Sequence, residues 1–139
     1  MSPLLVGLAL TIGAPALKEK GTPASLVGEW EIEDSTVGGK PTGKSPNRWL
    51  FRADGTRAIF GPDGKELIGG NYTADAKDGT VDLDSTGGPA PGGQYLCRFK
   101  LDGDKLMLNV GWQKAPRPAG MEPGSECTLY LMRRAKAKD

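Results

Sequence analysis

Histidine is absent from this 139-residue chain. The chain therefore lacks the commonest general base near neutral pH and the commonest metal ligand. Neither sign of charge is in excess, because the chain has 18 basic and 17 acidic residues. No global field then attracts nucleic acid or an anionic membrane. We expect a protein that is not an enzyme and has no cofactor, no metal and no nucleic-acid partner.

Long hydrophobic runs are missing as well. The apolar run Leu4–Ile12 is too short to cross a bilayer, and Ala14-Pro15-Ala16 follows it. This order is typical of a secretory signal peptide that is cleaved after Ala16. We predict a signal peptide over residues 1–16, a periplasmic or secreted protein and no stable membrane insertion. The alternative is a buried N-terminal strand or helix.

Cysteine is scarce, with only Cys97 and Cys127. Two lone cysteines in an oxidising compartment tend to pair. However, one predicted strand separates the two strands that carry them, and two strand spacings are about 9.6 Å, beyond disulfide reach. Both side chains are predicted to point inward at the same end of the fold. A disulfide and two free thiols therefore remain alternatives.

Turn-forming residues are abundant, with 21 glycines and 11 prolines. Asp-Gly, a strong hairpin signal, occurs at Asp54, Asp63, Asp78 and Asp102. Between the turns, apolar residues alternate with polar ones, as in strands with one dry face. The predicted strands are Gly28–Asp34, Arg48–Ala53, Thr56–Gly61, Glu66–Ala74, Thr80–Asp84, Gln94–Leu101, Lys105–Trp112 and Glu126–Arg134.

Eight hairpin-linked strands predict an all-β fold, an eight-stranded antiparallel up-and-down barrel of the lipocalin-like kind. A two-sheet β-sandwich is the alternative. The barrel is expected over residues 26–134, after a lead-in at 17–25 with at most one helical turn, and before a basic tail at 135–139. Two long loops, Ser85–Gly93 and Gln113–Ser125, are expected at the same end of the barrel.

The stretch GGKPTGKS, Gly38–Ser45, satisfies the pattern of the phosphate-binding loop of nucleotide hydrolases. That loop requires a buried strand before it and a helix that opens at its Lys-Ser. Here a half-polar strand precedes the stretch, and Pro46 and a short strand follow it. We therefore predict an exposed loop between the first two strands, with no nucleotide bound.

Aromatic side chains are spread over many of the predicted strands, so they are able to line an apolar pocket or to fill a small barrel. The candidate interior residues are Trp49, Phe51, Tyr72, Tyr95, Phe99, Leu108, Trp112 and Leu129. The main hypothesis is a monomeric barrel that binds a small apolar or amphipathic molecule. The alternatives are a filled barrel that binds a protein or a cell-envelope polymer through its loops and, last, a hydrolase that uses Lys44 and carboxylates.

The ends of the chain predict how the barrel closes. The eighth strand is expected to pair with the first, so the start of the first strand lies beside the end of the eighth. Trp30 points inward two residues after Gly28, and Arg133 shares a face with Leu129 and Leu131. We predict that Arg133 stacks on the Trp30 ring and that Gly28, Trp30 and Arg133 form a structural plug.

Five motifs, in order, resemble a family of small exported lipocalin-like domains of unknown function that is abundant in planctomycete-type bacteria. The motifs are LVGEW, GNYTADAKDGTVDLD, YLCRFKLDGDKLMLNVGW, RPAGMEP and LYLMRR. The resemblance covers Leu26 to Arg134. It differs from the family pattern in that Cys97 stands on the sixth strand and Met121 follows Arg117-Pro118. It implies an eight-stranded barrel with Gly28 and Trp30 at its closed end, and no activity.

Overall fold

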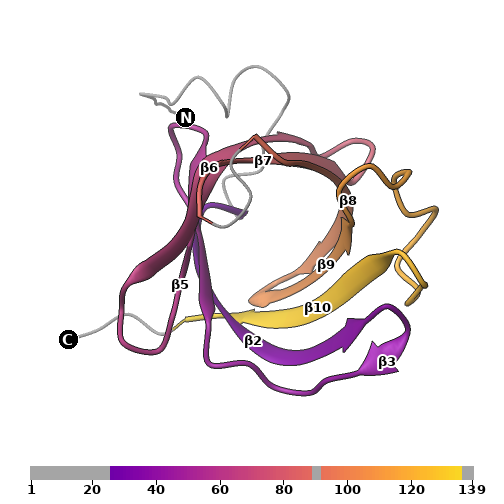
Figure 1. The fold of residues 1–139 in the computed structure, drawn as a ribbon, viewed down its shortest axis with the longest axis horizontal. Coiled ribbons are helices and arrows are strands. Elements are labelled where there is room, and N and C mark those ends of the chain that lie inside the picture. The colour runs from indigo at the N-terminus through magenta and orange to yellow at the C-terminus, as the bar shows by residue number, and fades with distance from the viewer. Residues whose placement is uncertain (1–25, 89–91, 136–139) are drawn as a thin grey trace, which may run out of the picture.

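The computed structural model describes residues 26–88 and 92–135, whose strands form one closed ring (Figure 1). The strands are β2 Gly28–Val37, β3 Lys40–Pro41, β4 Arg48–Phe51, β5 Thr56–Phe60, β6 Glu66–Asp75, β7 Thr80–Gly87, β8 Gln94–Asp102, β9 Lys105–Gly111 and β10 Cys127–Arg134. Each strand except the short β3 lies within one of the predicted segments or extends it by a few residues.

The sheet is an antiparallel meander that closes on itself. Each strand from β4 to β10 pairs with the next along the chain, β2 pairs with β4, and β10 pairs with both β9 and β2. This confirms the eight-stranded up-and-down barrel and excludes the two-sheet sandwich. β3 was not predicted; it pairs only with the end of β2, outside the ring of eight.

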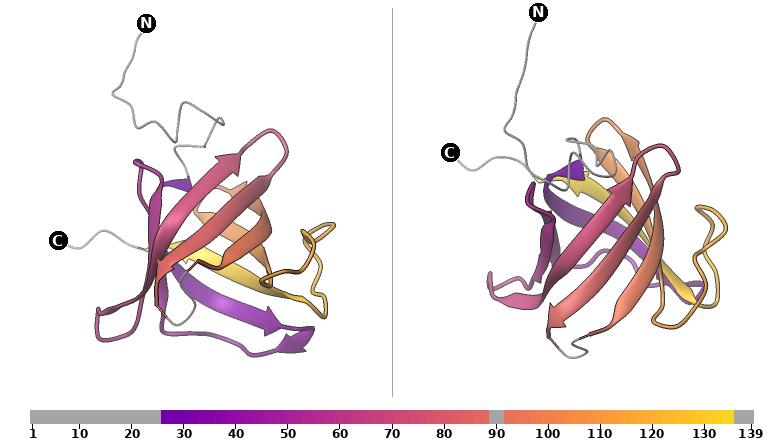
Figure 2. Two further views of the ribbon diagram at one scale, coloured as in Figure 1. Left: turned by 45° about the horizontal axis from the view of Figure 1, so that its top comes forward. Right: turned by 90° about the horizontal axis from the view of Figure 1, so that it is seen from above.

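The two ends of the barrel differ in the length of their connections. At one end, which we term the closed end, short turns join the strands at residues 52–55, 76–79 and 103–104. At the other, the open end, the connections span residues 38–47, 61–65, 88–93 and 112–126. The two longest predicted loops do lie at the same end. Figure 2 shows the β2–β3 hairpin beside the β9–β10 connection, where the Gly38 N–H donates to the Cys127 carbonyl.

Packed side chains fill the closed end. Trp30 is fully buried, and its indole Nε1 donates a hydrogen bond of 3.0 Å to the carbonyl of the buried Leu26. The rings of Phe51 and Tyr72 meet edge to face at 5.0 Å, and the Tyr72 hydroxyl donates to the Arg52 carbonyl. Burial of these large apolar side chains stabilises the barrel, and the bonds leave their polar atoms satisfied.

The first and last strands of the barrel pair as predicted, but a different arginine stacks on Trp30. Arg134, not Arg133, lies over the Trp30 ring, 4.3 Å from its centroid, and it is the direct cross-strand partner of Trp30. Gly28 adopts φ 136°, and a Cβ there would lie 2.8 Å from Arg134 Nη1. Gly28 therefore leaves the guanidinium its place beside the ring.

The wrong arginine was predicted because the wrong face of β10 was expected to point into the barrel. The inward side chains are Tyr130, Met132 and Arg134, opposite the inward Leu108, Leu106 and Trp30. The alternate set, with Leu129, was predicted to face inward because it is equally apolar. Its apolar character has another cause, since the β9–β10 connection covers that outer face.

Several predictions concern residues outside the described ranges. The signal peptide at 1–16, the lead-in at 17–25 and tail residues 136–139 are among them. Ala135 is described, and its N–H donates to the Glu29 carbonyl. Within residues 26–88 and 92–135 the structure contains no helix that could span a membrane.

Candidate ligand-binding site

A pocket of about 210 Å³ enters the barrel interior from the open end. Its apolar and indole lining consists of Trp49, Ile59, Ile68, Leu83, Val110 and Trp112. Its polar lining consists of Arg57, Ser85, Thr128 and the two phenols of Tyr95 and Tyr130. The barrel is thus filled at its closed end and hollow toward its open end, a combination of the two alternatives for the interior.

The predicted interior residues divide between these two regions. Trp49, Tyr95 and Trp112 line the pocket. Four others belong to the packed core and do not line it: Phe51, Tyr72, Phe99 and Leu108. Leu129 was assigned to the wrong face, because it lies opposite Asn109 on the outside of the barrel.

Arg57 is the lining residue that the sequence analysis missed and that most changes the chemistry of the pocket. Its exposed fraction is 3 %, although it carries a full charge. It follows Thr56 in the stretch TRAIF, where it shares a face with the apolar Ile59. A charged residue on the apolar face of a predicted strand was the signal available in the sequence.

A break in the β6–β7 ladder holds the Arg57 guanidinium. The register shifts between Gly69 and Gly70. A Cβ on Gly70 would lie 1.8 Å from the Asp84 carbonyl oxygen, so the close approach of these strands requires glycine. Arg57 Nε and Nη2 donate to that carbonyl at 3.1 and 2.8 Å, and Nη2 also donates to Ser85 Oγ at 3.1 Å.

The Arg57 guanidinium has only neutral partners. None of the ion pairs among the described residues includes Arg57. The Asp84 carboxylate acts on it at longer range and accepts a hydrogen bond from the Asn71 N–H. Burial lowers the pKa of Arg57, because desolvation disfavours its charged form.

The Trp49 ring lies beside this guanidinium on the pocket side. Its carbon lies 5.8 Å from the centroid of the Trp49 ring, and that ring lies 5.4 Å from Tyr130. Burial raises the pKa of Tyr130, so the phenol stays neutral at physiological pH. Trp112 is 40 % exposed at the pocket's edge, with its Nε1 donating to Thr128 Oγ1 at 3.0 Å.

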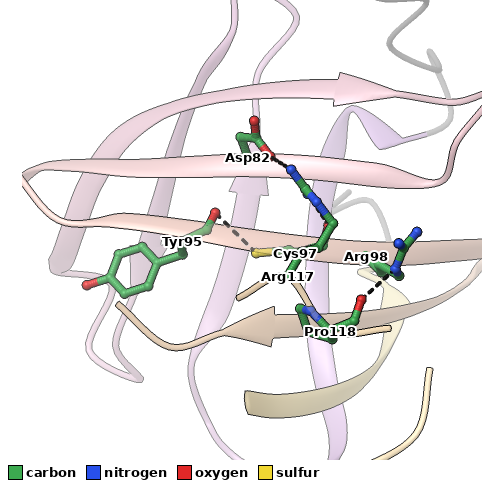
Figure 3. A network of polar contacts seen from close by, with 6 residues as sticks. All are labelled: Asp82, Tyr95, Cys97, Arg98, Arg117 and Pro118. Carbon is green, nitrogen blue, oxygen red and sulfur yellow. Dashed lines mark hydrogen bonds and ion pairs between the residues drawn. The ribbon is translucent and has the colours of Figure 1, made fainter. Parts of the chain in front are cut away.

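The β9–β10 connection folds back over the outside of the barrel and is tied to it by polar contacts (Figure 3). Arg117 donates to the Cys97 carbonyl at 2.7 Å and pairs with Asp82 at 2.6 Å. Arg98 donates to the Pro118 carbonyl. The buried Asn109 amide donates to two further carbonyls of the connection, and its Oδ1 has no hydrogen-bond partner among the described residues.

The two cysteines lie on opposite faces of the strand wall, and both are free. Cys97 belongs to the core cluster, and its burial raises the pKa of the thiol to about 12. Cys127 was predicted to face inward, but it lies under the β9–β10 connection, where a Cβ on Gly124 would meet its sulfur at 3.2 Å. The disulfide alternative is therefore not realised.

The segment Gly38–Ser45 forms the β2–β3 turn, the strand β3 and part of the irregular chain before β4, without a helix. This is the exposed loop that the sequence predicts. Two aspartates are engaged in ion pairs within the chain: Asp82 pairs with Arg117, and Asp104 pairs with Arg134. In residues 26–88 and 92–135, no group of three or more Cys, Asp or Glu side chains is arranged to hold a metal ion.

Comparisons with known proteins give no further guidance, since the chain matches no protein-family model and no curated protein. The geometry of the barrel and its pocket therefore carries the functional argument.

Proposed function

We propose that this protein is an exported, non-enzymatic, lipocalin-like barrel that binds a small apolar or amphipathic molecule in its open-end pocket. The observation that carries the proposal is the hollow, mostly apolar interior next to a fully packed closed end. Binding sites are typically concave and apolar, with a few polar groups that orient the ligand.

The large apolar side chains exposed on the surface support an entrance at the open end. Among the described residues these are Val37, Leu67 and Trp112. Val37 ends β2, Leu67 is near the start of β6, and Trp112 follows β9, so all three lie toward the open end. Trp112 also lines the pocket, and exposed apolar surface beside a pocket is a feature of ligand-binding grooves.

The volume of the pocket limits the size of the ligand. Sites for drug-sized ligands usually enclose about 300–1,000 Å³, and an apolar cavity of about 150 Å³ holds one benzene molecule. At about 210 Å³ the pocket suits one aromatic ring or a short alkyl chain with a head group. Export and membership of the planctomycete-type family belong to this proposal and rest on the sequence motifs.

A small neutral amphiphile tests the proposal directly. Binding of 3-phenyl-1-propanol, followed by tryptophan fluorescence, is expected for the wild-type chain because Trp49 and Trp112 line the pocket. Val110→Phe fills the pocket and should weaken binding at least about tenfold, since the ring must displace the ligand. Met107→Phe, on the opposite face of β9, is the matched control and should bind as the wild type does. Equal binding by both variants would contradict the pocket as the site.

A further inference from the structure

One charged residue, Arg57, lines the pocket, and it forms no ion pair with a described residue. Arg57 is buried, its Nε and Nη2 are bonded to neutral oxygens, and Nη1 donates to no described residue. Arg57 nonetheless lines the open-end pocket. The guanidinium therefore reaches the pocket with an unused donor.

A structural role explains only part of this arrangement. Two bonds to the Asp84 carbonyl tie β5 to the irregular β6–β7 ladder, and a neutral amide side chain could make a comparable link. Burial of a charge without an ion partner costs free energy that a neutral residue would not cost. The charge itself is thus unexplained by the contacts within the chain.

We propose that Arg57 binds the anionic head group of the ligand, and that the ligand is a small aromatic or short aliphatic monocarboxylate. This inference rests on the proposed function and names the ligand class. The planar guanidinium matches a carboxylate and forms short, charge-assisted hydrogen bonds with it. The apolar part of the ligand then packs against Trp49, Tyr130 and Val110.

The composition of the lining favours a monoanion over a phosphate ester. Arg57 is the one cationic residue among the lining residues. A phosphate carries more charge and more acceptor oxygens than one guanidinium with a single free nitrogen can serve. The hydroxyls of Ser85 and Thr128 also line the pocket and offer neutral donors to a second carboxylate oxygen.

Two probes that share one carbon skeleton and differ only in the head group measure what the head group contributes to binding. We expect the wild-type chain to bind 3-phenylpropionate at least about tenfold more tightly than 3-phenyl-1-propanol, given the strength of hydrogen bonds to charged groups. Arg57→Met should abolish this preference for the acid. Arg57→Lys keeps the positive charge but lacks the planar guanidinium, so it should keep part of the preference for the acid.

The outcomes separate the two proposals. If the wild-type chain binds the alcohol as tightly as the acid, Arg57 is not a head-group receptor, and the proposed function stands. If neither probe binds, the proposed function fails as well. Should Arg57→Met not unfold cooperatively, Arg57→Lys and the wild-type preference decide the question. A preference for the acid that persists unchanged in a folded Arg57→Met chain also overturns the inference.

Discussion

The two ends of the barrel each contain an arginine beside a tryptophan, and the two pairs differ in what completes them. At the closed end the Arg134 carbon lies 4.3 Å from the centroid of the Trp30 ring. Arg134 also donates to the Val27 carbonyl at 2.9 Å and pairs with Asp104 at 3.4 Å. In the open-end pocket Arg57 lies 5.8 Å from the Trp49 ring centroid and forms no ion pair with a described residue.

The difference shows how one pair of residue types serves two purposes. A stacked arginine with its charge paired and its donors bonded within the chain completes a packed structure. A stacked arginine that is buried beside a hollow, with charge and donor left over, is arranged for a group from outside the chain. The packed character of the closed end is the side of this comparison that stability measurements test most directly.

The largest expected effect is the difference in stability lost when the tryptophan at each end is replaced by alanine. Trp30→Ala removes a fully buried ring and its bond to Leu26, so it should lower the free energy of unfolding by about 3–5 kcal/mol. Trp112→Ala, at the open end, removes a ring that is 40 % exposed and should cost about 1 kcal/mol or less. Urea denaturation measures both changes. If the two variants lose equal stability, the closed end is not the packed end.

Most of the barrel could be predicted from the sequence, because hairpin turns and apolar alternation are local signals. All eight ring strands match segments predicted from these signals, and the pairing of β10 with β2 follows from the even number of strands. The faces of β10 could not be predicted in the same way. The preceding β9–β10 connection folds back over this outer face at Cys127, which local alternation does not reveal.

The candidate site was harder to predict than the fold. Trp49, Tyr95 and Trp112 follow from inward alternation, but the boundary between hollow and packed interior depends on how long-range neighbours fill space. The position of Arg57 depends on an irregular ladder at Gly70, and no local pattern specifies that irregularity. Arg57 itself was visible as a charge on an apolar face.

A second prediction uses pH to test the packing of the closed end. Burial raises the pKa of Tyr72 to about 12, from an ordinary value of 10.0. Between these values the unfolded chain has lost the phenolic proton and the folded chain retains it, so stability falls as pH rises. The contribution is fully present below pH 10.0 and should decline by about 1.4 kcal/mol per pH unit above it.

Urea denaturation at pH 9 and at pH 11 measures this decline. Tyr72→Phe should have a lower stability at pH 9, because it loses the bond to the Arg52 carbonyl, but a shallower decline toward pH 11. Cys97→Ala is a useful second variant, since the raised pKa of that buried thiol adds to the same alkaline loss. An unchanged slope in Tyr72→Phe would show that the phenol is not buried as described.

The smallest expected effect concerns neighbouring arginines at the closed end. Arg134→Met removes the stacking on Trp30, the bond to the Val27 carbonyl and the pair with Asp104, and it should cost about 1–2 kcal/mol. Arg133→Met is the matched control, because Arg133 faces outward and forms only a solvent-exposed pair with Glu33. It should leave the unfolding midpoint unchanged, since such surface pairs contribute little.

A double-mutant cycle then assigns the loss to the stack itself. Trp30→Leu retains an apolar side chain but removes the ring face, so the cycle with Arg134→Met should give a coupling of about 0.5–2 kcal/mol. The same cycle with Arg133→Met should give no coupling. If the coupling appears with Arg133 and not with Arg134, β10 is inserted with its other face inward. The inward face that the sequence predicts for β10 would then be correct, and Leu129 and Cys127 would belong to the barrel interior.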